Sequence, residues 1–516
     1  MQRAGGRRSH DRMLSLTETT RPAPCPTPFN LAAYVLAHAD IVPDKIALQI
    51  LRRTGAERWS YARLRGAVLG VSHGLASMGL PEGGRVLLRL GNGVEFPLAF
   101  LGAVAAGLIP VAMPAGLTVP EVSTLAAAVN PSLCVVGDDI SVPDQFIPVI
   151  TSTKLRQLAD GPTGGFAMGD PERAAYMVYT SGTSGSPRAV VHAHRAVWAR
   201  RMMWHGWYDL SDSDRLLHAG AMNWTFTLGT GLFDPWAIGA TALVPASGTE
   251  IEHLPLLLKR FDATIFAAAP GVYRRLLKSC AQLSLPKLRH GLSAGENLPD
   301  AIRAGWIKAT GKHVYEAYGL SECSTFISAA PTRSAPEGAT GFPQQGRHVA
   351  VVGDDGSPVA RGEAGILAIH RDDQGMFLGY HGAESDRQDR FCGDWFLTGD
   401  RVSMDPDGAI RYLGREDDMM NAGGFRVSPV EVETSLALCP GAGAVAAVEL
   451  RPDSTRSYIA AFYTGDASTE YMAKHADANL APHKRPRAYH AVAALPMTAN
   501  GKLNRRALRE EWEASI

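Results

Sequence analysis

The chain has few cysteines and no net charge, and both features exclude whole classes of function. Six cysteines are dispersed over 516 residues, without the close pairs of a zinc site or the density of a disulfide scaffold. This pattern suits a reducing compartment, so we expect a cytoplasmic protein. Basic and acidic residues number 51 each, which argues against a nucleic-acid surface or a polybasic membrane anchor.

Long apolar runs are also missing. The longest uncharged stretch, residues 96–120, is interrupted by Pro110 and Pro114, so it predicts a buried helix followed by a buried strand rather than a membrane span. The first residues are charged and lack the apolar core of a secretory signal. We predict a disordered tail over residues 1–27, with initiation at Met13 as one alternative and an organellar transit peptide as a weaker one.

The length and the pattern of the chain predict two domains. A chain of 516 residues exceeds the size of a single core. Helix-like and strand-like segments alternate from about residue 29, which predicts an α/β protein whose sheets are covered by helices. Near residue 415 a β-rich stretch gives way to charges and a glycine pair, and a helix then begins with Ser428 as N-cap and Pro429 at its first position. We therefore predict a large domain over 28–416 and a mobile small domain over 417–516.

A hydroxyl- and glycine-rich loop predicts phosphate binding. Residues 179–188 read Tyr-Thr-Ser-Gly-Thr-Ser-Gly-Ser-Pro-Arg, between a strand-like run over 174–179 and a helix-like run over 194–204. Glycines allow the backbone to approach an anion, and successive N–H groups and hydroxyls can donate to phosphate oxygens. The loop lacks the Gly-Lys-Ser/Thr ending of the P-loop, which disfavours a kinase or a hydrolytic ATPase.

Four further clusters follow this loop along the chain. They are Tyr318-Gly-Leu-Ser-Glu322, Trp395-Phe-Leu-Thr-Gly-Asp400, Arg411-Tyr-Leu-Gly-Arg-Glu-Asp-Asp418 and Leu495-Pro-Met-Thr-Ala-Asn-Gly-Lys502-Leu-Asn-Arg-Arg506. In this order and spacing, over about residues 28–510, the chain resembles the adenylate-forming acyl-CoA synthetase superfamily, and most of all its benzoate-type and medium-chain acyl-CoA ligases. The resemblance implies a large N-terminal domain of helix-covered β-sheets with a β-barrel-like subdomain, and a small hinged α+β C-terminal domain.

The resemblance also implies the substrates and the site. ATP, Mg²⁺ and coenzyme A would be used, with Glu322 binding Mg²⁺, a hard cation that prefers oxygen ligands. Residues implied at the β- and γ-phosphates are Thr180, Ser181, Gly182, Thr183, Ser184, Gly185 and Arg188. Residues implied around the rest of the nucleotide are Ala294, Gly295, Glu296, Glu316, Ala317, Tyr318, Gly319, Ser321, Asp400, Arg415 and Arg426. Arg188 departs from the family's usual lysine, which keeps the charge but changes its geometry.

Lys502 is the residue that we expect to carry the first chemical step. A carboxylate that attacks the α-phosphate brings two anions together, and like unit charges at about 4 Å cost roughly 4 kcal/mol at an effective dielectric near 20. A lysine delivered by the mobile domain would offset that repulsion. As the resemblance implies, the small domain would then rotate about Asp417, and Gly423 and Gly424 would line a tunnel for coenzyme A.

The acid pocket is implied around Trp224, Phe226, Ala294 and Gly319. Counting back from Gly239, Phe226 stands where amino-acid-activating relatives place an aspartate. An apolar ring offers no partner to an ammonium group, so we expect an aromatic or a short- to medium-chain acid. Trp224 would line or gate the pocket, although both rings could equally be part of the core.

Alternative functions remain open at this point. The chain could load a carrier-protein thiol instead of coenzyme A, or it could be a non-catalytic acyl-nucleotide binder, although a mere binder has no need of Lys502. The predicted partners are the acid, ATP and coenzyme A, with neither nucleic acid nor a membrane span. A homodimer and a lysine acetyltransferase acting on Lys502 are further hypotheses. His192 and His194 are expected to be packing residues rather than metal ligands.

Overall fold

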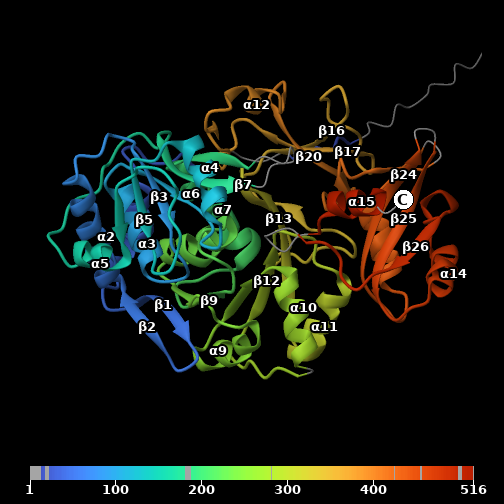
Figure 1. Ribbon diagram of the computed structural model, residues 1–516, viewed down its shortest axis with the longest axis horizontal. Helices are drawn as coiled ribbons and strands as arrows, with labels where there is room; N and C mark the ends of the chain where they lie inside the picture. The colour runs from blue at the N-terminus through green and yellow to red at the C-terminus, as the bar shows by residue number, and fades with distance from the viewer. Residues whose placement is uncertain are drawn as a thin grey trace, which may run out of the picture.

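The computed structural model describes residues 13–17, 22–180, 187–280, 282–422, 425–453, 456–497 and 503–514. A large N-terminal part continues, after strand β21 (Ile410–Arg415), into a small C-terminal part (Figure 1). Both parts mix helices with sheets. The predicted fold class, an α/β protein with a large helix-covered domain and a small α+β domain, is therefore confirmed.

Two large sheets form the body of the N-terminal part. The first has, in spatial order, β15 (Phe342–Pro343), β14 (Ser324–Ser328), β13 (Val314–Leu320), β12 (His290–Ala294), β11 (Ile265–Ala268), β9 (Arg215–His218), β10 (Thr241–Pro245), β1 (Ile46–Arg52) and β2 (Gly55–Ser60). The second has β18 (Gly379–Tyr380), β8 (Arg188–Ala193), β7 (Ala174–Thr180), β4 (Ile109–Ala112), β3 (Arg85–Arg89), β5 (Leu133–Val136) and β6 (Val149–Thr151). Their inner strands are mostly parallel and buried on both faces, which explains their continuous apolar sequences.

Helices fill the space between these sheets and cover their outer faces. Helices α2 (Tyr61–Ala76) and α3 (Glu95–Ala105) share one core with inward-facing residues of both sheets. Because α3 is apolar on every side, it suits this doubly covered position. Helix α5 (Ser152–Ala159) packs in the same core as α2 and α3. The covering helices are α4 (Val119–Val129), α9 (Leu254–Arg260), α10 (Pro270–Ser279) and α11 (Asp300–Thr310).

Short helices connect these layers. They are α1 (Leu31–Val35), α6 (Arg195–Ala199), α7 (Arg201–Met203), α8 (Asp234–Ala237), α12 (Glu384–Gln388), the 3₁₀ helices η1 (Ala37–Asp40) and η4 (Ile251–His253), and the π-helices η2 (Trp204–Tyr208) and η3 (Thr227–Phe233). The helix expected over 194–204 is thus divided into α6 and α7 and continues into η2. No helix within the described residues is long and apolar enough to cross a bilayer.

A third sheet supports the site from the side. It consists of β16 (Val349–Val352), β17 (Ala364–His370), β20 (Trp395–Met404), β19 (Phe391–Cys392) and β21. Residues 13–17 attach to it, because Leu14 and Leu16 form antiparallel bridges to Ala360 and Ala350 and Ser15 is fully buried. The predicted disordered tail over 1–27 is therefore wrong for residues 13–17, where backbone pairing with this sheet fixes the chain.

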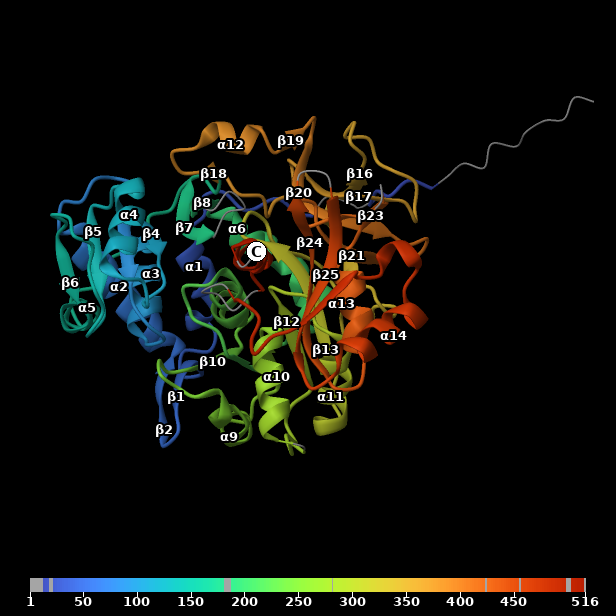
Figure 2. The same cartoon turned by 45° about the vertical axis from the view of Figure 1, so that its right-hand side comes forward.

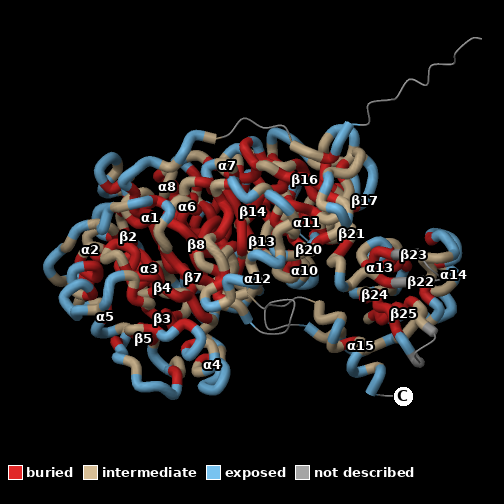
Figure 3. The backbone as a smooth tube through the Cα atoms, turned by 90° about the horizontal axis from the view of Figure 1, so that it is seen from above, coloured by how far each residue is buried: buried red, intermediate tan, exposed pale blue. Residues whose placement is uncertain are grey.

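The C-terminal part has its own small core. It contains the hairpin of β22 (Met420–Ala422) and β23 (Phe425–Val427), the sheet of β24 (Ala442–Asp453), β25 (Arg456–Gly465) and β26 (Ala488–Ala491), the 3₁₀ helix η5 (Pro482–Lys484), and helices α13 (Pro429–Ala437), α14 (Thr469–Asn479) and α15 (Arg505–Glu513). Figure 2 shows β24 and β25 beside α13, and Figure 3 shows buried residues gathered inside this part.

The start of α13 follows the sequence prediction. The Ser428 side chain accepts a hydrogen bond from the Glu431 amide at 3.2 Å, and Pro429 occupies the first turn. The predicted boundary between residues 416 and 417 falls in the turn that joins β21 to β22. As a domain limit it stays a prediction.

Candidate active site

The predicted site residues that follow β12 and β13 lie at one edge of the first sheet. Strands β12 and β13 are parallel neighbours that end at Ala294 and Leu320. Because carboxyl ends of parallel strands lie at the same edge, the loops that contain Gly295 and Glu322 emerge side by side. Ligands of open α/β sheets bind at such edges, so the candidate site is placed here.

Two glycines allow close packing at this edge. Gly295 has a φ of +94°, and a Cβ atom there would lie 2.7 Å from the indole of Trp224. A Cβ atom at Gly319 would overlap the backbone of Ser324. Glycine is therefore required sterically at both positions, and at Gly295 by the backbone conformation as well. Ala294 and Ala317 are buried in the neighbouring strands.

Glu322 is a buried carboxylate with a hydroxyl partner. Its side chain is held by Tyr380, whose hydroxyl donates to Oε1 at 2.6 Å. The guanidinium of Arg188 lies 5.2 Å from the centre of the same tyrosine ring. Arg188 thus reaches the Glu322 region through a planar contact that a lysine could not reproduce in the same way. Sequence reasoning missed Tyr380, which β18 brings in from 58 residues further along the chain.

His192 fixes the backbone of Ser321, the residue before Glu322. Its Nε2 lies 2.7 Å from the carbonyl oxygen of Ser321, so this nitrogen donates. Its ring stacks on Tyr176 with centroids 4.8 Å apart, and burial lowers the pKa of His192 to about 4. His194 accepts a hydrogen bond from the Leu31 amide through Nδ1. Both histidines therefore act in packing, as expected.

Two buried ion pairs support the loop after Glu322. Arg347 pairs with Asp373 at 2.6 Å, both fully buried, and donates to the carbonyl of Thr325. Arg200 pairs with Asp234, also at 2.6 Å, and bonds to Ser324 Oγ. These pairs fix the segment that follows the proposed metal ligand, because breaking a buried pair costs far more than an exposed one. Dispersed in sequence, they gave no motif by which to predict them.

Asp400 is the second buried carboxylate of the site. Tyr318 donates a short hydrogen bond to Oδ2, Tyr412 donates to Oδ1 at 3.2 Å, and the Arg415 guanidinium lies 3.3 Å from both oxygens. Burial raises the pKa of Asp400, and Arg415 opposes this shift. Burial acts to lower the pKa of Arg415, but the charges of Asp400 and Asp417 outweigh it. Asp400, Tyr318 and Arg415 were predicted as site residues, whereas Tyr412 was not.

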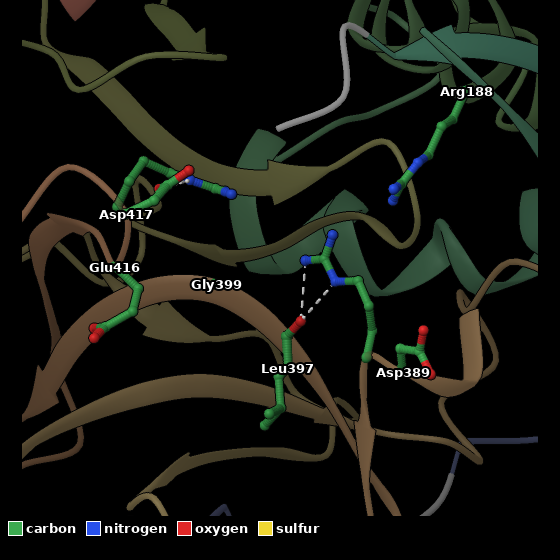
Figure 4. Close-up of a pocket in the computed structure, with 8 residues that line it drawn as sticks. Arg188, Asp389, Leu397, Gly399, Glu416 and Asp417 are labelled. Atoms are coloured by element: carbon green, nitrogen blue, oxygen red, sulfur yellow. Dashed lines mark hydrogen bonds and ion pairs between the residues drawn. The ribbon is translucent and has the colours of Figure 1, made fainter. Parts of the chain in front are cut away.

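A pocket of about 470 Å³ adjoins this carboxylate (Figure 4). Its lining residues are Arg188, Asp389, Arg390, Leu397, Gly399, Arg415, Glu416 and Asp417. Figure 4 shows Arg188 and Asp417 on opposite sides of the space. Arg390, another residue that the motifs did not reveal, donates to the carbonyls of Leu397 and Thr398 at 3.0 and 2.7 Å. Three arginines and three acidic residues line this pocket, so its charged groups are of both signs.

Glu316 has a supporting role in this arrangement. Its carboxylate accepts from the Leu298 amide and from Arg303, both at 2.9 Å, and burial raises the pKa of Glu316 to about 7. The side chain therefore braces the loop that begins at Gly295. Direct contact between Glu316 and a nucleotide stays a prediction. Glu296, in that same loop, is half-exposed.

An aromatic cluster packs against β12 of the first sheet. Phe226 is buried, with its ring centre 5.2 Å from that of Trp224 and 5.7 Å from that of Trp207. Leu292 and Ala294 of β12 pack in this cluster. The predicted pocket residues Trp224, Phe226 and Ala294 are thus brought together beside the Gly295 loop.

Part of the predicted site lies outside the described residues. This applies to Ser181, Gly182, Thr183, Ser184, Gly185, Gly423, Gly424 and Lys502, and to the side chain of Arg426. Thr180 and Arg188, at the ends of the phosphate loop, pair across β7 and β8. Asp417 is in the turn after β21, where its carboxylate lies 3.5 Å from Arg415.

The donor set at Glu322 suits a hard cation. No group of three or more His, Cys, Asp and Glu side chains in the described parts of the chain could enclose a metal by itself. A single buried carboxylate matches the way in which Mg²⁺ is commonly held, by one or two carboxylates together with phosphate oxygens. The residues therefore fit Mg²⁺ bound jointly with a phosphorylated ligand.

Comparisons with known proteins identify the family of the chain. A family model described as AMP-binding enzyme matches residues 36–381, and a model of the AMP-binding enzyme C-terminal domain matches residues 431–502. The chain is 29% identical to a 4-hydroxybenzoate–CoA/benzoate–CoA ligase from Rhodopseudomonas palustris, covering 87% of this chain and 88% of the relative. It is 28% identical to the human mitochondrial acyl-coenzyme A synthetase ACSM2A, covering 95% and 92%. The crystal structure of the anthranilate CoA ligase AuaEII with anthranoyl-AMP matches with a TM-score of 0.86 and 28% identity, covering 95% of this chain and 99% of the other.

Proposed function

Because the chain belongs to the AMP-binding enzyme family, we propose that it is an ATP-dependent carboxylic acid–CoA ligase. The acid first displaces pyrophosphate from ATP to give an acyl-adenylate. The thiol of coenzyme A then attacks the acyl carbon, and AMP leaves. The relatives named as benzoate–CoA ligases and as an acyl-coenzyme A synthetase support this reaction class.

The observation that carries the proposal is the presence of two buried carboxylates, each held by specific partners, near a pocket that Arg188 and Arg415 help to line. Glu322 and Asp400 come from different sheets, and Arg415 and Arg188 border the space next to them. Buried carboxylates are costly unless they bind a partner. A nucleoside triphosphate offers a partner to each, namely a phosphate-bound cation and a ribose.

The ribose is assigned to Asp400. Its oxygens accept from Tyr318 and Tyr412, and hydroxyl groups of a sugar are donors of the same kind. Arg415 balances the carboxylate charge while it holds the geometry. Adenine is then assigned to the space between Tyr318 and the loop that begins at Gly295.

Glu322 is assigned to Mg²⁺, which would shield the charge of the triphosphate when bound. The Tyr380 hydroxyl orients the carboxylate through Oε1. His192 fixes the backbone at Ser321, the residue proposed to contact the α-phosphate. Arg188 and residues 180–185 are proposed to hold the outer phosphates.

Lys502 is proposed to supply the charge that adenylation requires. Two approaching anions repel by about 4 kcal/mol at 4 Å in a medium of effective dielectric near 20. A positioned ammonium group offsets this repulsion and the charge that grows in the transition state. Rotation about Asp417 would then withdraw Lys502 and bring Gly423 and Gly424 to the pantetheine path, with Arg426 changing its contacts. A homodimer and acetylation of Lys502 stay predictions.

The acid is proposed to be aromatic or of short to medium length. The cluster around Phe226 presents rings and aliphatic groups, and burial of an unpaired ammonium group against them would be costly. This disfavours an amino acid. Aromatic acids can use edge-to-face contacts with these rings.

A panel of carboxylic acids with ATP and Mg²⁺, run with and without coenzyme A, tests the proposal. We expect AMP release and a CoA-thioester mass from a benzoate-like or medium-chain acid. Acid-dependent pyrophosphate exchange without a thioester would instead indicate a carrier-protein loader. No turnover with any acid, beside an active control ligase, would contradict the proposal and favour a non-catalytic binder.

A further inference from the structure

His218 is a polar residue in the aromatic cluster to which neither motif nor mechanism assigns a role. It is the last residue of β9 and is fully buried. Side chains alternate along a strand, so His218 shares a sheet face with Leu216, which belongs to the cluster around Phe226. The imidazole meets Phe226 edge to face, with ring centres 4.3 Å apart at 78°.

Local contacts fix the orientation of this ring. Nδ1 accepts a hydrogen bond from the Gly220 amide at 3.0 Å and lies 3.2 Å from the Thr227 hydroxyl. Glycines make room for the ring, because a Cβ atom at Gly231 would lie 2.9 Å from His218 Cβ and one at Gly220 would lie 3.0 Å from Cε1. The imidazole is therefore held in one position rather than free to search for partners.

The same contacts determine which ring nitrogen of His218 carries the proton. Because Nδ1 accepts from a backbone amide, the proton of the neutral ring is on Nε2. Burial lowers the pKa of His218 to about 3, so the ring is neutral at physiological pH. Nε2 is buried and has no hydrogen-bond partner among the residues that the structure describes. A buried donor of this kind is rare in folded proteins and calls for an explanation.

We propose that the Nε2–H of His218 is a specificity-determining donor for an oxygen substituent on the ring of an aromatic acid. This inference rests on the proposed function and narrows its substrate class. An aromatic ring matches the edge-to-face arrangement of Trp224, Phe226 and His218. A hydroxyl, methoxy or carbonyl oxygen can accept from Nε2, whereas an amino substituent is mainly a donor and gains nothing.

The experiment compares benzoate with its hydroxy-, methoxy- and amino-substituted isomers in the purified full-length enzyme. The readout is the ratio of kcat/KM for each substituted acid to kcat/KM for benzoate. We expect at least one oxygen-substituted isomer to be favoured, and His218→Leu to lower its ratio by about tenfold or more. Benzoate itself should change by less than about threefold, because it makes no hydrogen bond at this position.

Two further variants control the result. His218→Gln places an amide donor near the position of Nε2 and should restore part of the ratio. His290→Gln changes another buried histidine of the same sheet, at the start of β12, where its ring lies against Tyr315. This control should leave the ratio unchanged.

Other outcomes would overturn either this inference or the proposed function. Equal loss for all acids in His218→Leu, or no preference for any oxygen-substituted isomer in the wild type, overturns the inference but leaves the ligase intact. Absence of turnover with benzoate and every isomer contradicts the proposed function instead. If the leucine variant does not fold, the ¹⁵Nε2 resonance of His218 in the wild type gives the answer. It should shift with an oxygen-substituted acid and stay in place with benzoate, and the opposite result overturns the inference.

Discussion

The two carboxylates of the site, Glu322 and Asp400, are both buried but lie in different electrostatic surroundings. Asp400 has a cation, Arg415, at 3.3 Å and two tyrosine hydroxyls as donors. Glu322 is held by one neutral hydroxyl, that of Tyr380, and forms no ion pair within the part of the chain that the structure describes. One carboxylate is thus neutralised by the protein, and the other keeps its charge for a ligand.

This difference explains the assignment of ligands. A carboxylate that an arginine balances can bind neutral sugar hydroxyls without an excess of negative charge near the phosphates. A carboxylate that the protein leaves unbalanced attracts a cation. The same residue type therefore serves two purposes, and the neighbouring side chains decide which.

The largest expected effect is that of removing Lys502, the positive charge proposed to act in adenylation. Lys502→Ala should lower the rate of adenylation by about 100- to 1000-fold, because it removes a positioned charge from the transition state. Acyl-CoA formation from a supplied acyl-adenylate should change little. Pyrophosphate exchange and thioester formation are measured separately, and an equal loss in both would contradict the assignment.

Glu322→Gln tests the unbalanced carboxylate. The amide can still accept from Tyr380 but lacks the charge for Mg²⁺, so we expect kcat to fall by about 10- to 100-fold and the Mg²⁺ concentration for half-maximal rate to rise. Glu172→Gln removes an exposed carboxylate that pairs with Arg195 and serves as the control. A Mg²⁺ dependence like that of the wild type would exclude Glu322 as a ligand.

Asp400→Asn tests the balanced carboxylate. We expect KM for ATP to rise by about tenfold, since hydrogen bonds to a charged group are lost and Arg415 loses its buried partner. Asp405→Asn, which breaks the pairing with Arg411 in the same sheet, should leave KM within about twofold. An unchanged KM in Asp400→Asn would remove the ribose from this position.

The two tyrosine hydroxyls should have smaller and separable effects. Tyr380→Phe should change the Mg²⁺ dependence, and Tyr412→Phe should change KM for ATP, each by about fivefold, as expected for a single hydrogen bond. Steady-state kinetics with varied Mg²⁺ and varied ATP distinguish them. Identical profiles for the two variants would show that the hydroxyls do not act through different carboxylates.

The last expected effect concerns the pH dependence of stability rather than the reaction rate. Burial lowers the pKa of His192 to about 4 from an ordinary 6.5. Between these values the unfolded chain binds more protons than the folded one, so stability falls as pH decreases from about 6.5 to 4, by up to about 1.4 kcal/mol per pH unit. His192→Gln should reduce this slope in urea unfolding between pH 5 and 7. A slope that is unchanged would show that His192 titrates normally.

Local sequence patterns predicted the motif residues of the site but not their supports. Tyr318, Glu322 and Asp400 are in contiguous motifs. Tyr318 and Glu322 lie near the end of β13, and Asp400 lies within β20. Tyr380 and Arg390 reach the site from positions without a motif of their own, because sheet pairing brings them there.

The ends of elements were predicted less well. The Ser428 cap was recognised, since its signal is local. Residues 13–17 were assigned to a disordered tail, although the alternation of Leu14 and Leu16 with polar residues is a short strand signal. Their pairing partners are more than 300 residues away, which no local pattern reveals.

One measurement compares the two carboxylates most directly. Rates with ATP and with 2′-deoxy-ATP are recorded over a range of Mg²⁺ concentrations for the wild type, Glu322→Gln and Asp400→Asn. Glu322→Gln should shift the Mg²⁺ dependence and keep the preference for ATP, whereas Asp400→Asn should lose the preference and keep the Mg²⁺ dependence. If both variants change both properties equally, or if the effects are exchanged, the assignment of cation and ribose to these two residues is wrong.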